Sequence, residues 1–98
     1  MTPEHAAEQL AEFRQGIDDL DIRLLDLLNQ RTRIVEQIGA VKESCAMPVY
    51  EPKREDAVYR NVLEHNHGPL SPDAVQRIFE RIIDEMRTLQ RVRMSKGS

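Results

Sequence analysis

The first 44 residues contain a long run of regularly spaced apolar side chains that no strong helix breaker interrupts. The apolar residues recur at alternating steps of three and four with one break, and they are Leu10, Phe13, Ile17, Leu20, Leu24, Leu27, Ile34, Ile38 and Val41. This is the heptad spacing of a helix that packs along one face. No proline occurs between Pro3 and Pro48, and a single glycine costs a helix only about 1 kcal/mol relative to alanine. The pattern therefore predicts one helix from about residue 3 to residue 44.

A helix of that length is too long for its own chain to cover. At 1.5 Å per residue it extends about 60 Å, whereas a compact domain of this size has a diameter of about 26 Å. A domain of 98 residues also buries only a modest share of its surface when it folds alone. We therefore expect a single domain over residues 1–98 whose long helix is covered by a second copy of the chain.

Two shorter helices are predicted after the first. Pro52 stands at the start of a helix over about 52–65, whose apolar side consists of Ala57, Val58, Val62 and Leu63. Ser71 and Pro72 open a third helix over about 72–93. Its apolar stripe consists of Val75, Ile78, Phe79, Ile82, Ile83, Met86 and Leu89. The sequence thus predicts an all-α fold with three helices per subunit.

Composition and spacing argue against several classes of function. A net charge of -3 gives no field that attracts nucleic acid or an anionic membrane. His65 and His67 lack the acidic or cysteine partners of a metal site, and no glycine-rich phosphate loop occurs. Cys45 is the only cysteine, so no disulfide can form within the chain. No apolar run is long enough to cross a membrane. The first residues are polar rather than those of a signal peptide. We expect a cytoplasmic protein without metal, membrane or nucleic-acid partners.

Two cations of the first predicted helix share a face. Arg31 occupies a heptad core position, where an unpaired charge is costly to bury. Lys42 follows 11 residues later, which is about 20° beyond three full turns and about 16 Å along the axis. The two side chains could hold a small dianion between their ends. Equally, Arg31 could bond a carboxylate of a neighbouring helix while Lys42 is solvated, and the residues alone favour neither interpretation.

Polar residues of the other two helices also have two interpretations. Gln90 continues the apolar stripe of the third helix, where its amide could bond a backbone carbonyl, the commoner fate, or donate to a buried ligand. Glu51 and Glu55 share a face at the start of the second helix, where helix capping is the default role for Glu51. Arg54 opposes the helix dipole there, which favours a role in binding an anion.

The residues resemble a known family over nearly the whole chain. The resemblance is carried by Phe13–Asp21, Leu24–Arg31 and Ile38–Lys42, and it continues through Val49, Arg54, Glu55, Ile78-Phe79 and Ile82-Ile83 to Gln90. As a set, these residues are similar to those of AroQ-class chorismate mutases, the all-helical type II enzymes.

The resemblance implies a fold, a reaction and a site. The fold is an intertwined, antiparallel helical homodimer, and the reaction is the intramolecular Claisen rearrangement of chorismate to prephenate in phenylalanine and tyrosine biosynthesis, without a cofactor. Lys42 and Gln90 would donate to the ether oxygen as it gains negative charge, arginines would clamp the two carboxylates, and Glu55 would orient the ring hydroxyl. The implied site residues are Arg14, Arg31, Lys42, Glu51, Arg54, Glu55, Met86 and Gln90.

Helix geometry separates Arg14 from the other site residues of its own chain. Arg14 lies 17 residues before Arg31, which is about 25 Å along a straight helix and about 100° around it. The two side chains therefore cannot meet one small ligand from the same helix. We expect the partner subunit to supply Arg14, because an antiparallel pair with its twofold axis near residue 25 places Arg14 opposite position 36 of the other chain.

The sequence departs from the family pattern at one position. Met86 stands where relatives often carry a small hydroxyl residue, so we expect one carboxylate contact to be absent.

The nearest alternative function is that of an isochorismate-pyruvate lyase of the same fold, against which Glu55 argues. A non-catalytic helical dimerisation or regulatory module is another. The chain could also be the mutase part of a bifunctional enzyme, for example one fused to prephenate dehydratase.

Overall fold

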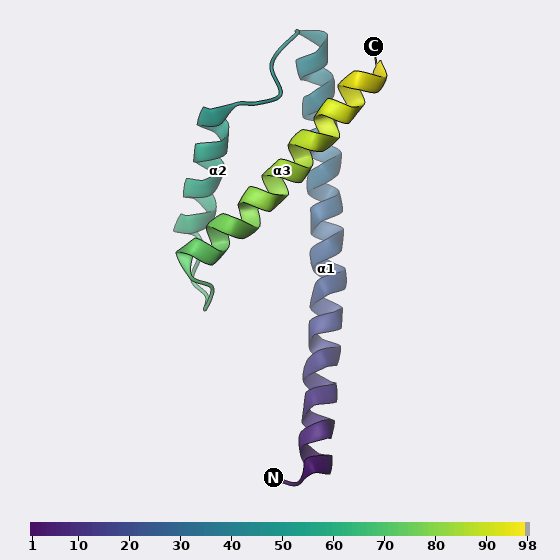
Figure 1. Cartoon of the computed structure of the whole chain (residues 1–98), viewed down its shortest axis with the longest axis vertical. Helices are drawn as coiled ribbons and strands as arrows, with labels where there is room; N and C mark the ends of the chain where they lie inside the picture. The colour runs from purple at the N-terminus through teal and green to yellow at the C-terminus, as the bar shows by residue number, and fades with distance from the viewer. Residues whose placement is uncertain (98) are drawn as a thin grey trace. The chain divides into compact units, whose positions relative to one another are not determined.

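The computed structural model describes residues 1 to 97 and the side chains of residues 1 to 95. These residues form three helices, α1 (Pro3–Ser44), α2 (Pro52–Glu64) and α3 (Pro72–Gly97), with no strand among them (Figure 1). The predicted all-α fold of three helices is therefore confirmed, although α3 continues beyond the predicted end at residue 93. Within the same residues, no helix combines the length and the apolar character that crossing a bilayer requires.

Side-chain caps fix the starts of two helices. The Thr2 side-chain oxygen accepts a hydrogen bond from the His5 backbone N–H at 3.1 Å. Ser71 does the same for the Ala74 backbone N–H, also at 3.1 Å. Each bond satisfies one of the backbone donors that the first turn of a helix leaves unpaired. Thr2 thus caps α1, and Ser71 caps α3 where the sequence predicted a helix start.

The chain divides into two compact units, and unit 1 (Met1–Arg33) is helical from Pro3 onward. Unit 1 is described in full, and none of its side chains is buried. Leu28 is half-buried, and the other large apolar residues of the unit are about half exposed or more, from 48% for Leu10 to 84% for Met1. The regularly spaced apolar face of this unit is therefore uncovered within a single chain.

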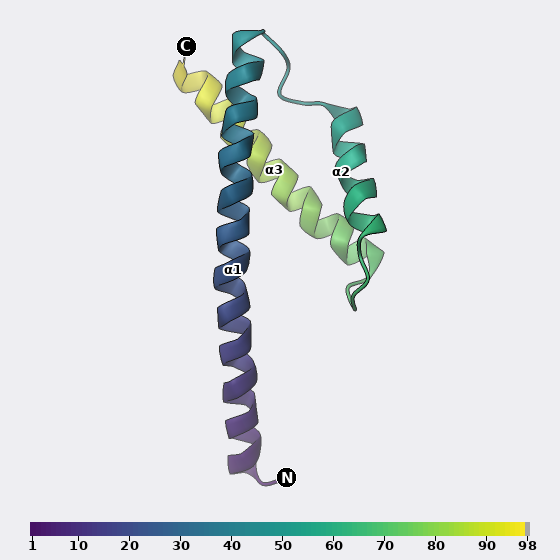
Figure 2. The same cartoon turned by 180° about the vertical axis from the view of Figure 1, so that it is seen from behind.

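Unit 2 (Ile34–Ser98) contains the last turns of α1 together with α2 and α3. Its buried apolar side chains are Val35, Val75 and Ile83. Figures 1 and 2 both show α3 crossing the last part of α1. At this crossing a Cβ atom on Gly39 would lie 3.6 Å from Cγ of Gln90. This is an ordinary van der Waals distance, so α3 packs against the end of α1 at Gly39.

A tight turn ends α1 and starts the loop toward α2. The Met47 backbone N–H donates to the Lys42 carbonyl at 2.8 Å, and the Ala46 N–H donates to the Glu43 carbonyl at 3.4 Å. This pair of bonds is the Schellman motif, which requires a left-handed residue just after the helix. Ala46 fills that place with a φ of 53°, although glycine adopts it with less strain. The turn brings the loop back along the end of α1.

Candidate functional site

Lys42 is a buried cation in the last turn of α1, with 7% of its surface exposed. Its Nζ lies 2.7 Å from Oε1 of Glu51 and donates a hydrogen bond to the Val49 carbonyl at 3.0 Å. The alternative in which Lys42 is solvated is therefore wrong. An ammonium group carries three N–H donors, so these two contacts leave one donor for a ligand.

Glu51 does not have the capping role that its position suggests. It occupies the N-cap of α2, yet its side chain makes no capping hydrogen bond. The carboxylate pairs with Lys42 instead, in a contact where both partners carry a charge. The default interpretation of Glu51 as a helix cap is therefore wrong. Its position at the helix start serves to bring the carboxylate to the end of α1.

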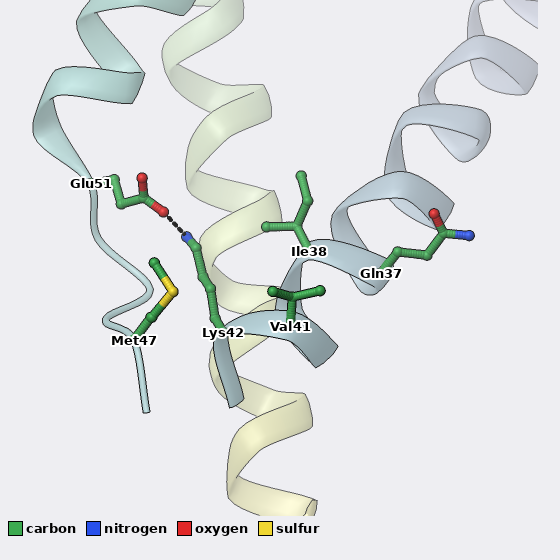
Figure 3. Close-up of a pocket in the computed structure, with 6 residues that line it drawn as sticks. All are labelled: Gln37, Ile38, Val41, Lys42, Met47 and Glu51. Atoms are coloured by element: carbon green, nitrogen blue, oxygen red, sulfur yellow. Dashed lines mark ion pairs between the residues drawn. The ribbon is translucent and has the colours of Figure 1, made fainter. Parts of the chain in front are cut away.

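An open pocket borders this ion pair (Figure 3). Its volume is about 310 Å³, which is within the range of small-molecule sites in proteins. The lining residues are Gln37, Ile38, Val41, Lys42, Met47 and Glu51. In Figure 3, Lys42 and Glu51 point toward each other and form the charged edge of an otherwise mainly apolar pocket. Of the eight predicted site residues, this pocket contains Lys42 and Glu51.

Gln90 is the second buried polar residue of unit 2. Its exposed fraction is 7%, and its Oε1 has no hydrogen-bond partner among the described residues. Buried polar atoms in folded proteins are nearly always hydrogen-bonded, so an unpaired end on a buried amide needs an explanation. The packing at Gly39 places this amide beside the last turns of α1, the element that also carries Lys42.

Glu55 is held by Arg87 of α3. Oε2 of Glu55 lies 3.3 Å from Nε of Arg87, and the two side chains are 17% and 26% exposed. Nη2 of Arg87 also contacts Oδ1 of Asp84 at 2.5 Å. The guanidinium carbon lies 5.3 Å from the centre of the Tyr50 ring, within the range of a cation–π interaction. The first turn of α2 and the loop before it are thus tied to one arginine.

The field between α2 and α3 is set by several carboxylates around Tyr59. Burial raises the pKa of the Tyr59 hydroxyl, and the charges of Glu55, Glu80 and Asp84 raise it further, while Arg87 opposes them. Of these charged neighbours, Arg87 is the one whose positive charge favours the ionised form of Tyr59.

The remaining predicted site residues are Arg14, Arg31, Arg54 and Met86. Arg14 and Arg31 belong to unit 1, where Arg14 is exposed and Arg31 is half-buried. In unit 2, Arg54 is exposed and Met86 is half-buried. Apart from the ion pair of Lys42 with Glu51, the grouping of the eight residues into one site stays a prediction.

Sequence reasoning missed two groups that hold site residues. Arg87 lies four residues after Ile83 and three before Gln90, so it occupies the inward-facing stripe of α3. A cation in that stripe was an available signal, of the same kind that singled out Arg31. The Val49 carbonyl that accepts from Lys42 is a backbone group and has no signal in the sequence.

Comparisons with known proteins agree on one family. Residues 13–91 match the family described as chorismate mutase type II. The bifunctional chorismate mutase/prephenate dehydratase of Neisseria gonorrhoeae is 38% identical over 86% of this chain and 23% of its own length. The chorismate mutase of Methanocaldococcus jannaschii is 28% identical over 86% of both chains. The chain spans about a quarter of the length of the bifunctional relatives.

A solved structure extends the agreement to the fold. The structure of chorismate mutase (form II) from Thermus thermophilus superposes with a TM-score of 0.82 and 26% sequence identity. The match covers 85% of this chain and 94% of that chain. The resemblance found in the sequence is therefore confirmed by independent comparisons of sequence and structure, and the chain belongs to the type II chorismate mutase family.

Proposed function

We propose that this chain is a chorismate mutase, which converts chorismate to prephenate in the biosynthesis of phenylalanine and tyrosine. One observation carries the proposal. The buried polar side chains of the described residues are Lys42 and Gln90, and these are the two residues that the family resemblance assigned to catalysis. Burying an ammonium and an amide in so small a core is costly, and a binding site explains that cost.

The reaction requires placement and electrostatics rather than proton transfer. Within one substrate molecule the ether C–O bond breaks while a C–C bond forms, so atoms and electrons balance without a cofactor or nucleophile. Negative charge builds on the ether oxygen as the bond breaks, and fixed donors that face this oxygen lower the barrier. The remaining N–H donor of Lys42 and the amide of Gln90 supply these donors.

The carboxylates of chorismate are bound by arginines from two chains. Arg31 and Arg54 come from one subunit and Arg14 from its partner, so the active enzyme is a homodimer. The exposed apolar face of unit 1 supports this assembly, because a large contiguous apolar surface on a soluble chain marks an interaction site. Met86 offers no hydroxyl to a carboxylate, so this enzyme binds chorismate more weakly than relatives with a hydroxyl residue there.

The protein works in the cytoplasm in this proposal. Cys45 is the only cysteine and it is free and exposed, which suits a reducing compartment better than an oxidising one.

An assay with two substrates tests the proposed reaction. The purified chain is supplied with chorismate and, separately, with isochorismate, and we expect prephenate from chorismate without pyruvate release. Pyruvate from isochorismate combined with inert chorismate would instead identify a lyase. Because the arginine clamp positions the substrate, Arg31→Ala lowers kcat/KM by about 100-fold or more while the dimer persists. Arg33→Ala, an exposed arginine two residues away, is the matched control. Full activity in Arg31→Ala would refute the site assignment.

A further inference from the structure

We propose that Arg87, a residue outside the predicted site, positions the Glu55 carboxylate for the substrate. This inference rests on the proposed mutase function, in which Glu55 orients the ring hydroxyl of chorismate. In this role Arg87 touches no substrate atom, and it affects the reaction only through the position of Glu55.

Arg87 is anchored from two sides by groups other than Glu55. Its Nη2 contacts the Asp84 carboxylate one turn earlier on α3, and its guanidinium lies over the Tyr50 ring of the loop before α2. A guanidinium group is planar and rigid, so two contacts on different sides fix the direction of its Nε edge. Nε lies 3.3 Å from Oε2 of Glu55.

The contact with Arg87 is made to one of the two carboxylate oxygens of Glu55. Nε of Arg87 lies 3.3 Å from Oε2, and this N–H is buried without a hydrogen bond of good geometry. Catalytic hydrogen bonds are often long before substrate binds and shorten in the complex. Because the contact is made to Oε2, the other oxygen of Glu55 accepts the ring hydroxyl of chorismate.

Shielding from water distinguishes this pair from an ordinary surface pair. Arg81 and Glu85 also form an ion pair on α3, but their side chains are 77% and 58% exposed. Exposed pairs of this kind contribute little, since water and salt screen them. Glu55 is only 17% exposed, so its orientation depends much more on Arg87 than on solvent.

A double-mutant cycle with chorismate as substrate tests the proposal. Arg87→Met keeps the length of the side chain but removes the charge, and we expect kcat/KM to fall about 10- to 100-fold. In the background of Glu55→Gln, the same change should alter kcat/KM by no more than about twofold, because the group that Arg87 positions is already disabled. A merely structural role for Arg87 predicts the same fold-loss in both backgrounds, and that result would overturn the proposal.

Two further variants keep the test decisive. Arg81→Met is the matched control, since it removes an exposed arginine from the same helix, and its kcat/KM should equal that of the wild type. Arg87→Lys retains the cation and loses the rigid fork, so its fold-loss should be smaller than that of Arg87→Met and should also vanish with Glu55→Gln. If circular dichroism shows that Arg87→Met is unfolded, the cycle with Arg87→Lys decides. An inactive wild type overturns the proposed function itself, whereas an active wild type with equal losses in both backgrounds overturns this inference alone.

Discussion

The two units of the chain treat apolar and polar side chains in opposite ways. In unit 1 the regularly spaced apolar residues of α1 are uncovered, and no side chain is buried. In unit 2 three helical segments bury Val35, Val75 and Ile83, yet the same core contains Lys42 and Gln90. Unit 2 thus builds a polar site from its own chain, whereas unit 1 has an apolar face that its own chain does not cover. This contrast supports the proposals that a second chain covers the apolar face of unit 1 and that a ligand binds in unit 2.

The largest expected effect comes from placing a charge on the apolar face of unit 1. Leu24 is 54% exposed within one chain, so a solitary chain should accept Leu24→Glu easily. If a partner covers this face, the variant buries an unpaired carboxylate, which costs about 3 kcal/mol or more and should abolish both the dimer and the activity. Sedimentation equilibrium measures the mass of the particle.

Ile22→Glu supplies the matched control for that experiment. Ile22 is 68% exposed and lies off the heptad face, so the variant should change the free energy of unfolding by less than about 0.5 kcal/mol and should remain dimeric. Equal behaviour of the two variants would remove the contrast between the faces of unit 1.

A smaller effect is expected for the buried amide of unit 2. Gln90→Met replaces a buried side chain that has an unpaired oxygen with an apolar one of similar shape, so the free energy of unfolding should rise by about 1 kcal/mol. Turnover of chorismate should fall about 100-fold, since a donor to the ether oxygen is lost. Urea unfolding and a rate assay measure the two quantities. Gln76→Met, on the same helix, is the control and should leave turnover unchanged. A loss of both stability and activity in Gln90→Met would mean that Gln90 is structural.

The smallest effect concerns the turn that places the loop near Lys42. Ala46 has a left-handed φ of 53°, so Ala46→Gly relieves strain and should raise the free energy of unfolding of unit 2 by about 0.5 to 1 kcal/mol. Ala40→Gly, inside α1, should lower it by about 1 kcal/mol. Thermal unfolding followed by circular dichroism gives both values. The same sign for both variants would contradict the turn geometry.

Local features of the chain could be predicted from the sequence, and long-range pairings could not. The bounds of α1 and the caps at Thr2 and Ser71 depend on residues within one or two turns, which the sequence displays directly. The pairing of Lys42 with Glu51 and of Glu55 with Arg87 depends on how helix faces meet in space. Residue spacing along one helix does not contain that information. Glu51 shows the consequence, because local rules assigned it to a cap.

We propose that Arg14 of one chain completes a site whose Arg31, Lys42 and Gln90 come from the other chain. Two inactive variants, Arg14→Ala and Arg31→Ala, are unfolded together in urea and refolded as a mixture. If Arg14 acts in the partner's site, each mixed dimer contains one intact site and one doubly defective site. With half of the dimers mixed, the mixture should regain about a quarter of the wild-type activity, measured as prephenate formed from chorismate. If the mixture stays as inactive as the separate variants although mixed dimers form, Arg14 does not serve the partner's site and the account is contradicted.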